Sequence, residues 1–132
     1  MNRIRLLVVD DEARVRQGLR MRLALEPDLE VVGEAADSET ALHLALLLRP
    51  DVVVIDLLMP GMDGLQAIRL LRTTLPASRV LAFSIRDELS TRRETAAAGA
   101  AAFVAKQDGP EHLLAAIRDI AARQRRHVIT QD

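Results

Sequence analysis

The sequence predicts an α/β fold, in which a doubly wound, five-stranded parallel sheet with strand order 2-1-3-4-5 carries helices on both faces. Two features predict this fold. Short apolar runs alternate with longer segments of helical period, as in chains of βαβ units. Polar residues directly follow several of these runs, at the edge where such sheets bind ligands. The length of 132 residues and the hydrophobic content of 49% suit one domain with one core.

The first two strands and helices follow from apolar patterns that end at polar or helix-breaking residues. A strand is expected over residues 4–9 and a helix over about 13–25. A second strand over 30–35 leads to a helix over 39–48, which Pro50 stops because proline cannot continue a helix.

The third unit begins with the apolar run at residues 52–55, which is expected to be a strand buried on both faces. Asp63, followed three residues later by Gln66, resembles a capping box for a helix over 65–74. Pro76 stops that helix.

The last two strands are expected over residues 79–83 and 101–105, and Gly99 suits the C-terminal turn of a helix over 89–98. The final helix is expected over about 110–126, with a proline in its first turn. One face of it should pack on the sheet, because four apolar residues recur there: Leu113, Ile117, Ile120 and Ala121.

Composition excludes several classes of protein. The 18 basic and 19 acidic residues give a net charge of −1 and no general attraction to nucleic acid or anionic membranes. The absence of cysteine excludes a disulfide framework and a zinc–thiolate site. The apolar runs are far shorter than the roughly 20 residues of a membrane span, and residues 10–12 interrupt any secretory signal with acidic groups. We expect a cytoplasmic protein with no direct contact to membrane or nucleic acid.

Only one of the 18 basic residues, Lys106, is a lysine. A chain that otherwise uses arginine keeps a compact ammonium here, which differs from the planar guanidinium in shape. Chance placement is the alternative. Three arginines near the end of the chain suit the negative end of a helix dipole, or alternatively a basic docking patch: Arg123, Arg125 and Arg126.

Polar side chains follow four of the five predicted strands. Asp10 and Asp11 follow the first strand, Asp56 the third, Ser84 the fourth and Lys106 the fifth. The carboxyl ends of parallel strands meet at one edge of the sheet, and strands one and three are neighbours in the expected order. We therefore expect three carboxylates in one crevice, with the hydroxyl and the ammonium beside them.

Three carboxylates in one crevice repel one another, so either some are protonated or a cation lies among them. Oxygen ligands without histidine or cysteine favour a hard divalent ion, Mg²⁺ or Mn²⁺. Such an ion lets an anionic phosphoryl donor approach an anionic nucleophile. Each residue also has a structural alternative. Asp10 or Asp11 can cap the next helix, Asp56 can be a structural strand end, and Ser84 can bond to nearby backbone.

Five stretches of the chain, in order, resemble the receiver domain of bacterial two-component response regulators. They are residues 6–12 (Leu-Leu-Val-Val-Asp-Asp-Glu), 51–64 (Asp-Val-Val-Val-Ile-Asp-Leu-Leu-Met-Pro-Gly-Met-Asp-Gly), 83–84 (Phe-Ser), 98–100 (Ala-Gly-Ala) and 103–106 (Phe-Val-Ala-Lys). The resemblance covers essentially the whole chain, and the second stretch is highly specific. It implies the CheY-like, flavodoxin-like (βα)5 fold, and it is closest to receivers of the LuxR-like (NarL/FixJ) transcription factors.

The resemblance implies that Asp56 accepts a phosphoryl group from a histidine kinase or a small phosphodonor, which gives an aspartyl phosphate. Asp11 would bind Mg²⁺ directly and Asp10 directly or through water. The backbone carbonyl of Leu58 would supply a further metal ligand. Lys106 would pair with a phosphoryl oxygen.

The implied output is a conformational signal, so the chain is a switch that takes part in its own phosphorylation and is not a turnover enzyme. In this family the hydroxyl residue, here Ser84, bonds to the phosphoryl group and moves toward it, and the aromatic residue at Phe103 turns inward. The surface of the fourth helix, fifth strand and fifth helix then changes. The implied partners are a sensor histidine kinase and, on phosphorylation, a second copy of the chain.

Three positions depart from the family pattern. Gln107 follows the lysine where many relatives have proline, and Ala102 stands where glycine is common, which affects how Phe103 turns. Leu58 replaces a polar residue of some relatives, and its bulk changes how fast water attacks the acyl phosphate. None of these departures removes a chemical group that phosphorylation requires.

Rival interpretations come from other classes. A haloacid-dehalogenase-like phosphohydrolase needs an acid two residues after the nucleophile, where this chain has Leu58. A flavodoxin-like electron carrier needs a hydroxyl-rich first loop and usually aromatic rings, whereas the loop here is acidic and the chain has no Trp or Tyr. A receiver that is no longer phosphorylated remains open, although the intact acidic and lysine positions argue against it.

Residues 1–126 are expected to form the receiver, and 127–132 a C-terminal tail or the start of a linker. Six residues cannot hold a helix-turn-helix. Either the chain is a stand-alone receiver, or it normally controls a C-terminal DNA-binding effector that this sequence lacks. The similarity around Lys106 to transcription-factor receivers favours the second alternative.

Overall fold

The computed structural model describes residues 2–59 and 63–131. One five-stranded sheet lies within them, and its paired strands are parallel in the order β2-β1-β3-β4-β5. The expected fold class and strand order are therefore confirmed. The elements are β1 (Ile4–Val9), α1 (Ala13–Leu23), β2 (Leu29–Ala35), α2 (Ser38–Leu48), β3 (Val52–Ile55), α3 (Gly64–Thr74), β4 (Arg79–Ser84), α4 (Leu89–Ala98), β5 (Ala102–Ala105), the 3₁₀ turn η1 (Lys106–Asp108) and α5 (Pro110–Gln131).

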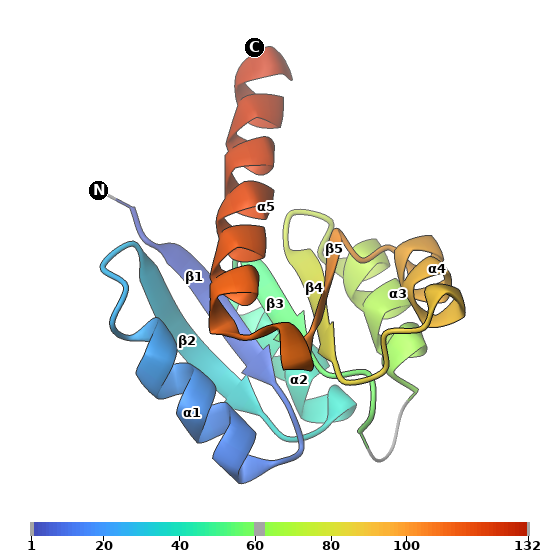
Figure 1. Ribbon diagram of the computed structural model, residues 1–132. Coiled ribbons are helices and arrows are strands. Elements are labelled where there is room, and N and C mark those ends of the chain that lie inside the picture. The colour runs from blue at the N-terminus through green and yellow to red at the C-terminus, as the bar shows by residue number, and fades with distance from the viewer. Residues whose placement is uncertain (1, 60–62, 132) are drawn as a thin grey trace.

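Helices cover both faces of the sheet (Figure 1). Successive strand residues point to opposite faces, so β1 contributes to two separate apolar clusters. Leu6 and Val8 belong to the cluster that includes buried residues of α1 and α5. Leu7 and Val9 belong to the cluster that includes buried residues of α2, α3 and α4. The expected apolar face of the last helix is confirmed, because all four of its residues are buried: Leu113, Ile117, Ile120 and Ala121.

The central position of β3 decides where the site lies. All four residues of β3 are buried, as expected for a strand covered on both faces. It pairs with β1 on one side and with β4 on the other. The residue that follows β3, Asp56, therefore emerges in the middle of the carboxyl edge of the sheet, beside the residues that follow β1.

Most predicted boundaries lie within two residues of the observed ones, and α5 differs most. It continues to Gln131 because no glycine or proline interrupts it after its first residue. The turn η1 was not expected, and it is followed by Gly109 as its C-cap, whose φ of 94° is a left-handed conformation that suits glycine. The side chains of Arg125 and Arg126, and those of the expected tail at 127–132, lie outside the described side chains.

Two of the predicted helix ends are confirmed, one of them with a different bond. Gly99 ends α4 with a φ of 116°. Asp63 is the N-cap of α3, but its carboxylate accepts from the N–H of Leu65 (3.1 Å), one residue earlier than in a capping box with Gln66. A capping side chain can bond to either the second or the third helical N–H, so the sequence spacing alone does not determine which one it takes.

Candidate functional site

Asp10 follows β1 and is buried, and three contacts fix its position. Its backbone N–H donates to the carbonyl of Ala35 (3.0 Å), and its own carbonyl accepts from the Arg16 guanidinium (2.6 Å). Its Oδ1 accepts from the N–H of Glu12 (2.9 Å). Glu12 is the N-cap of α1, so the structure does not support the structural alternative that Asp10 or Asp11 caps this helix. Asp10 holds the β1–α1 turn through Oδ1, which leaves Oδ2 for the site.

Asp56 follows β3 and is buried, with 5% of its surface exposed. Its backbone N–H donates to the carbonyl of Val9 (3.0 Å), which continues the pairing of β1 with β3 by one residue. Its Oδ1 accepts from the N–H of Leu58 (3.1 Å). The side chain is thus held at the edge of the sheet by the strand before it and the loop after it.

Lys106 joins the ends of three strands. It follows β5, and its Nζ donates to Oδ2 of Asp10 (2.6 Å) and to Oδ2 of Asp56 (3.3 Å). Its side chain is 15% exposed, so these charge-assisted bonds form in a partly dry environment, where they are stronger than in water. The expectation that the one lysine lies beside the acidic residues is confirmed.

Asp11 completes an acidic cluster with Asp10 and Asp56. Each of the three side chains offers one ligand atom, and these atoms lie within 4.8 Å of one another. Asp11 is exposed, whereas the other two are buried. Three carboxylates against one ammonium leave net negative charge, and an all-oxygen donor set matches a hard divalent cation. The residues present therefore fit Mg²⁺ or Mn²⁺.

The pKa shifts of Asp56 and Lys106 agree with a site that needs positive charge. Burial raises the pKa of the Asp56 carboxyl above its ordinary value, against the opposing effects of the Leu58 N–H and of Lys106, and the charge of Asp10 adds to the rise. Burial alone would lower the pKa of Lys106, but its bond to Asp10 and the two carboxylate charges outweigh burial and raise it. Lys106 therefore stays charged at neutral pH, while the charged form of Asp56 is disfavoured.

The raised pKa of Asp56 predicts how the free energy of unfolding depends on pH. Because the folded-state pKa of Asp56 is above the ordinary 3.8, the folded protein binds more protons than the unfolded chain above that pH, and its free energy of unfolding falls as pH rises through this window. Without divalent ions, Asp56→Asn should therefore raise the free energy of unfolding at neutral pH, and the gain should shrink as the pH is lowered to 3.8 and below. Urea unfolding at several pH values measures it. A variant less stable than the parent at neutral pH would contradict this expectation.

Ser84 and Phe103 lie on the neighbouring strands. Ser84 ends β4, is fully buried and is paired in register with Ala105, the residue before the lysine. Its Oγ accepts from the N–H of Arg86 (3.2 Å). Phe103 lies in β5 and is partly exposed, with the Arg92 guanidinium carbon 4.6 Å from its ring centroid. The hydroxyl thus lies next to the site, and in the described structure it bonds to the backbone of the loop that follows it.

The sequence did not identify two arginines that this geometry makes relevant. Arg16 donates to the carbonyl of Asp10 and pairs with Glu34 (3.5 Å), and Arg92 lies over Phe103. Glu34 and Phe103 lie in β2 and β5, away from the helices that carry these arginines, and the bond of Arg16 to Asp10 is to a backbone carbonyl, so no local sequence pattern marks either residue. Pro60, Gly61 and Met62, in the middle of the most specific motif, lie outside the described residues.

In the part of the chain that the structure describes, no helix combines the length and apolar character needed to cross a membrane.

Comparison with known proteins gives consistent matches. A family model described as the response regulator receiver domain matches residues 6–118. The response regulator GacA of Pseudomonas aeruginosa is 41% identical over 122 residues, which are 92% of this chain and 57% of that protein. A protein-glutamate methylesterase/protein-glutamine glutaminase of Cereibacter sphaeroides is 40% identical over 124 residues, 92% of this chain and 34% of that one.

A crystal structure of a LuxR-family two-component response regulator from Aurantimonas superposes with a TM-score of 0.87 at 36% identity, over 92% of this chain and 86% of that chain. The chain spans little more than half the length of GacA and about a third of the methylesterase. Two proteins of different length and different name therefore share with this chain the region that it spans.

Proposed function

This chain belongs to the response regulator receiver domain family, and we propose that it is a phosphorylation switch in which Asp56 accepts the phosphoryl group. One observation carries the proposal. The buried carboxylate of Asp56 lies within reach of both the ammonium of Lys106 and the other two carboxylates of the acidic cluster, at the central carboxyl edge of the sheet. A structural aspartate would need neither neighbour, whereas phosphoryl transfer to a carboxylate needs positive charge around the nucleophile.

The chemistry is an in-line displacement at phosphorus. One oxygen of the Asp56 carboxylate forms a P–O bond, and the P–N bond of a phosphohistidine, or the P–O bond of a small donor, breaks. The leaving group keeps the bonding electron pair. Lys106, which in the described structure bonds to Oδ2 of Asp56, then pairs with a phosphoryl oxygen. Ser84 donates its hydroxyl to another phosphoryl oxygen, and its movement toward the phosphoryl group takes its Oγ away from the Arg86 N–H, whose bond it accepts in the described structure.

A divalent cation, Mg²⁺ or Mn²⁺, would be held by Asp10, Asp11, Asp56 and the backbone carbonyl of Leu58. When bound, it offsets the repulsion between the carboxylates and the incoming phosphoryl oxygens. The chain's own residues orient the nucleophile: the Leu58 N–H holds Oδ1 of Asp56, and Lys106 holds Oδ2.

The phosphoryl donor in the cell would be a sensor histidine kinase, and the phosphorylated chain would form a homodimer. Ser84 and Phe103 carry the change to the surface of α4, β5 and α5. Residues 1–126 act as the receiver, and residues 127–132 lead toward an effector. The resemblance to LuxR-like transcription factors, which the likeness to a LuxR-family regulator supports, makes a DNA-binding effector the expected output. We expect the switch to act in the cytoplasm and this chain itself to bind no nucleic acid.

The test is phosphorylation by acetyl phosphate, followed by intact mass. We expect one added phosphoryl group per chain in the presence of Mg²⁺, and none after chelation, because the uncompensated carboxylates repel the donor. Adding Mn²⁺ in excess of the chelator should restore labelling, since Mn²⁺ and Mg²⁺ both prefer oxygen ligands. Equal labelling with and without chelator would show that the acidic cluster does not hold a required cation.

A further inference from the structure

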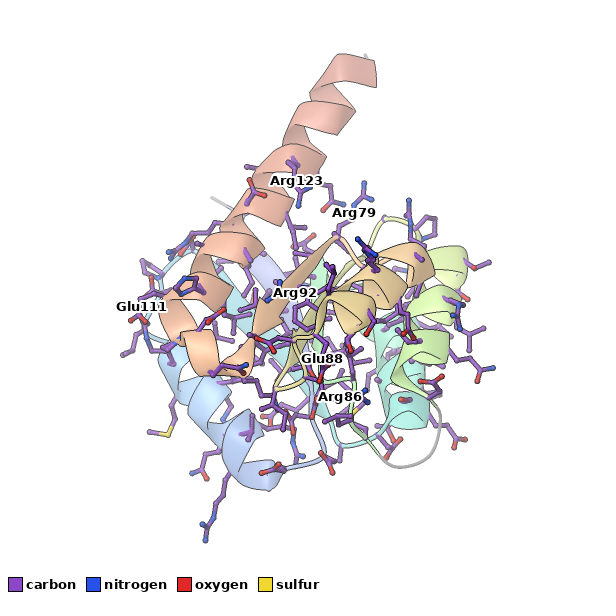
Figure 2. The ribbon with its side chains drawn as sticks, turned by 45° about the vertical axis from the view of Figure 1, so that its right-hand side comes forward. Arg79, Arg86, Glu88, Arg92, Glu111 and Arg123 are labelled. Carbon is purple, nitrogen blue, oxygen red and sulfur yellow. The ribbon has the colours of Figure 1, made fainter. Side chains whose placement is uncertain are left out.

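Arg92 joins α4 to β5 through the ring of Phe103. Its guanidinium carbon lies 4.6 Å from the ring centroid, and both residues are partly exposed. Figure 2 shows Arg92 on α4, close to β5. A guanidinium over an aromatic face within about 6 Å is attracted by the ring quadrupole. The contact therefore favours the position that Phe103 occupies in the described structure.

The same side chain also holds the loop that follows β4. The Nε of Arg92 donates to the backbone carbonyl of Asp87 (3.2 Å). One residue earlier in this loop, the N–H of Arg86 donates to the Oγ of Ser84 (3.2 Å). A continuous series of contacts thus runs from the buried hydroxyl beside Lys106, through residues 84–87, to the guanidinium over Phe103.

We propose that Arg92 is a positioning residue, which stabilises the unphosphorylated arrangement by holding Phe103 and the β4–α4 loop together. The proposal rests on the proposed function, in which Ser84 leaves the Arg86 N–H and Phe103 turns inward. Both movements strain the contacts of Arg92: the first displaces the loop that carries Asp87, and the second removes the ring from beneath the guanidinium. Arg92 thereby sets how readily the switch responds.

The size of the effect follows from linkage. A contact present only in the unphosphorylated arrangement weakens the binding of any phosphoryl group that favours the other arrangement, by the same factor. A cation–π contact at a partly exposed site corresponds to roughly a 2- to 5-fold change in the equilibrium. Removing it should therefore tighten binding at a site that Arg92 does not touch.

The test compares Arg92→Met with the parent chain. Methionine keeps an unbranched apolar stem over the ring and removes the charge and the N–H groups. Arg93→Met is the matched control, because Arg93 is the adjacent residue, is exposed, and makes no side-chain bond or ion pair within the described residues. Each protein is titrated with beryllofluoride, a phosphoryl mimic, in saturating Mg²⁺, and backbone amide signals of Asp56 and Ala105 report the midpoint.

The midpoint for Arg92→Met should fall by about 2- to 5-fold, that for Arg93→Met should be unchanged, and Arg92→Lys should lie between, because it keeps the cation. If the contact only stabilised the fold, its removal would not tighten the binding of beryllofluoride. An Arg92→Met midpoint equal to or above that of the parent therefore overturns the proposed role of Arg92. If the parent chain still binds beryllofluoride in that case, the proposed function itself stands. A parent that binds no beryllofluoride and takes up no phosphoryl group refutes the proposed function and the inference with it.

A second readout uses the scarcity of aromatic residues. The chain has two Phe and no Trp or Tyr, so fluorophenylalanine gives one signal for Phe83 and one for Phe103. The Phe103 signal should move at saturating beryllofluoride in the parent chain. If the amides show binding and this signal does not move, Phe103 keeps its position on phosphorylation and the proposed role of Arg92 is wrong.

Discussion

The Asp56→Asn protein is expected to take up no phosphoryl group from acetyl phosphate in the presence of Mg²⁺. The amide is nearly the same size as the carboxylate and can still accept the Leu58 N–H through its oxygen, so the fold should persist. It carries no negative charge, and its nitrogen lone pair is delocalised into the carbonyl, so it is not a nucleophile under these conditions. Intact mass measures the result, and phosphorylation should fall below detection.

Asp63→Asn is the matched control for this experiment. Asp63 is a second carboxylate of the loop that follows β3, but it is exposed and caps α3, and asparagine serves almost as well as aspartate at an N-cap. Its variant should be labelled like the parent. Equal labelling of Asp56→Asn and the parent would refute the assignment of the nucleophile.

Lys106→Met is expected to slow phosphorylation by about 100-fold, which is the lower end of the loss seen when one preorganised charge-stabilising donor is removed from an active site. Its ammonium contacts both buried carboxylates, so methionine leaves their charges without the one basic side chain that pairs with them among the described residues. The time course of acetyl phosphate labelling, followed by mass, gives the rate. An unchanged rate would mean that the single lysine only neutralises the aspartates in the resting protein.

Lys106→Arg separates charge from shape. The chain should still fold, because arginine restores the positive charge beside Asp10 and Asp56. We expect it to respond poorly, since a longer planar group does not place a single donor between two oxygens as Nζ does at 2.6 and 3.3 Å. Beryllofluoride-induced movement of the Phe103 signal measures the response. A normal response from Lys106→Arg would make the preference for lysine a coincidence.

The sequence predicted the parts of the fold that depend on local pattern. The run at residues 52–55 predicts a buried central strand because its side chains are apolar on both faces. Once β1 and β3 are neighbours, Asp10, Asp11 and Asp56 must lie at one edge, and this convergence is what the structure shows. Polar residues that directly follow strands are therefore placed by topology alone.

Features that depend on side-chain reach or on contacts between distant segments were not predictable in this way. Nothing in the sequence specifies that Lys106 bonds to Asp10 more closely than to Asp56, because this depends on the conformation of η1. The contact of Arg92 with Phe103 joins a helix to a strand across the sheet edge. The end of α5 was placed too early, because the run of polar residues at 123–127 interrupts the apolar period, whereas no glycine or proline stops the helix there.

The position of the phosphoryl group is the most direct measure of the proposed mechanism. An aspartyl phosphate formed with acetyl phosphate and Mg²⁺ can be reduced by borohydride, which converts the modified aspartate to homoserine, and peptide mass spectrometry then locates that residue. We expect homoserine at position 56 and at no other aspartate. Homoserine at position 10, 11 or 63, with position 56 unmodified, would contradict the account.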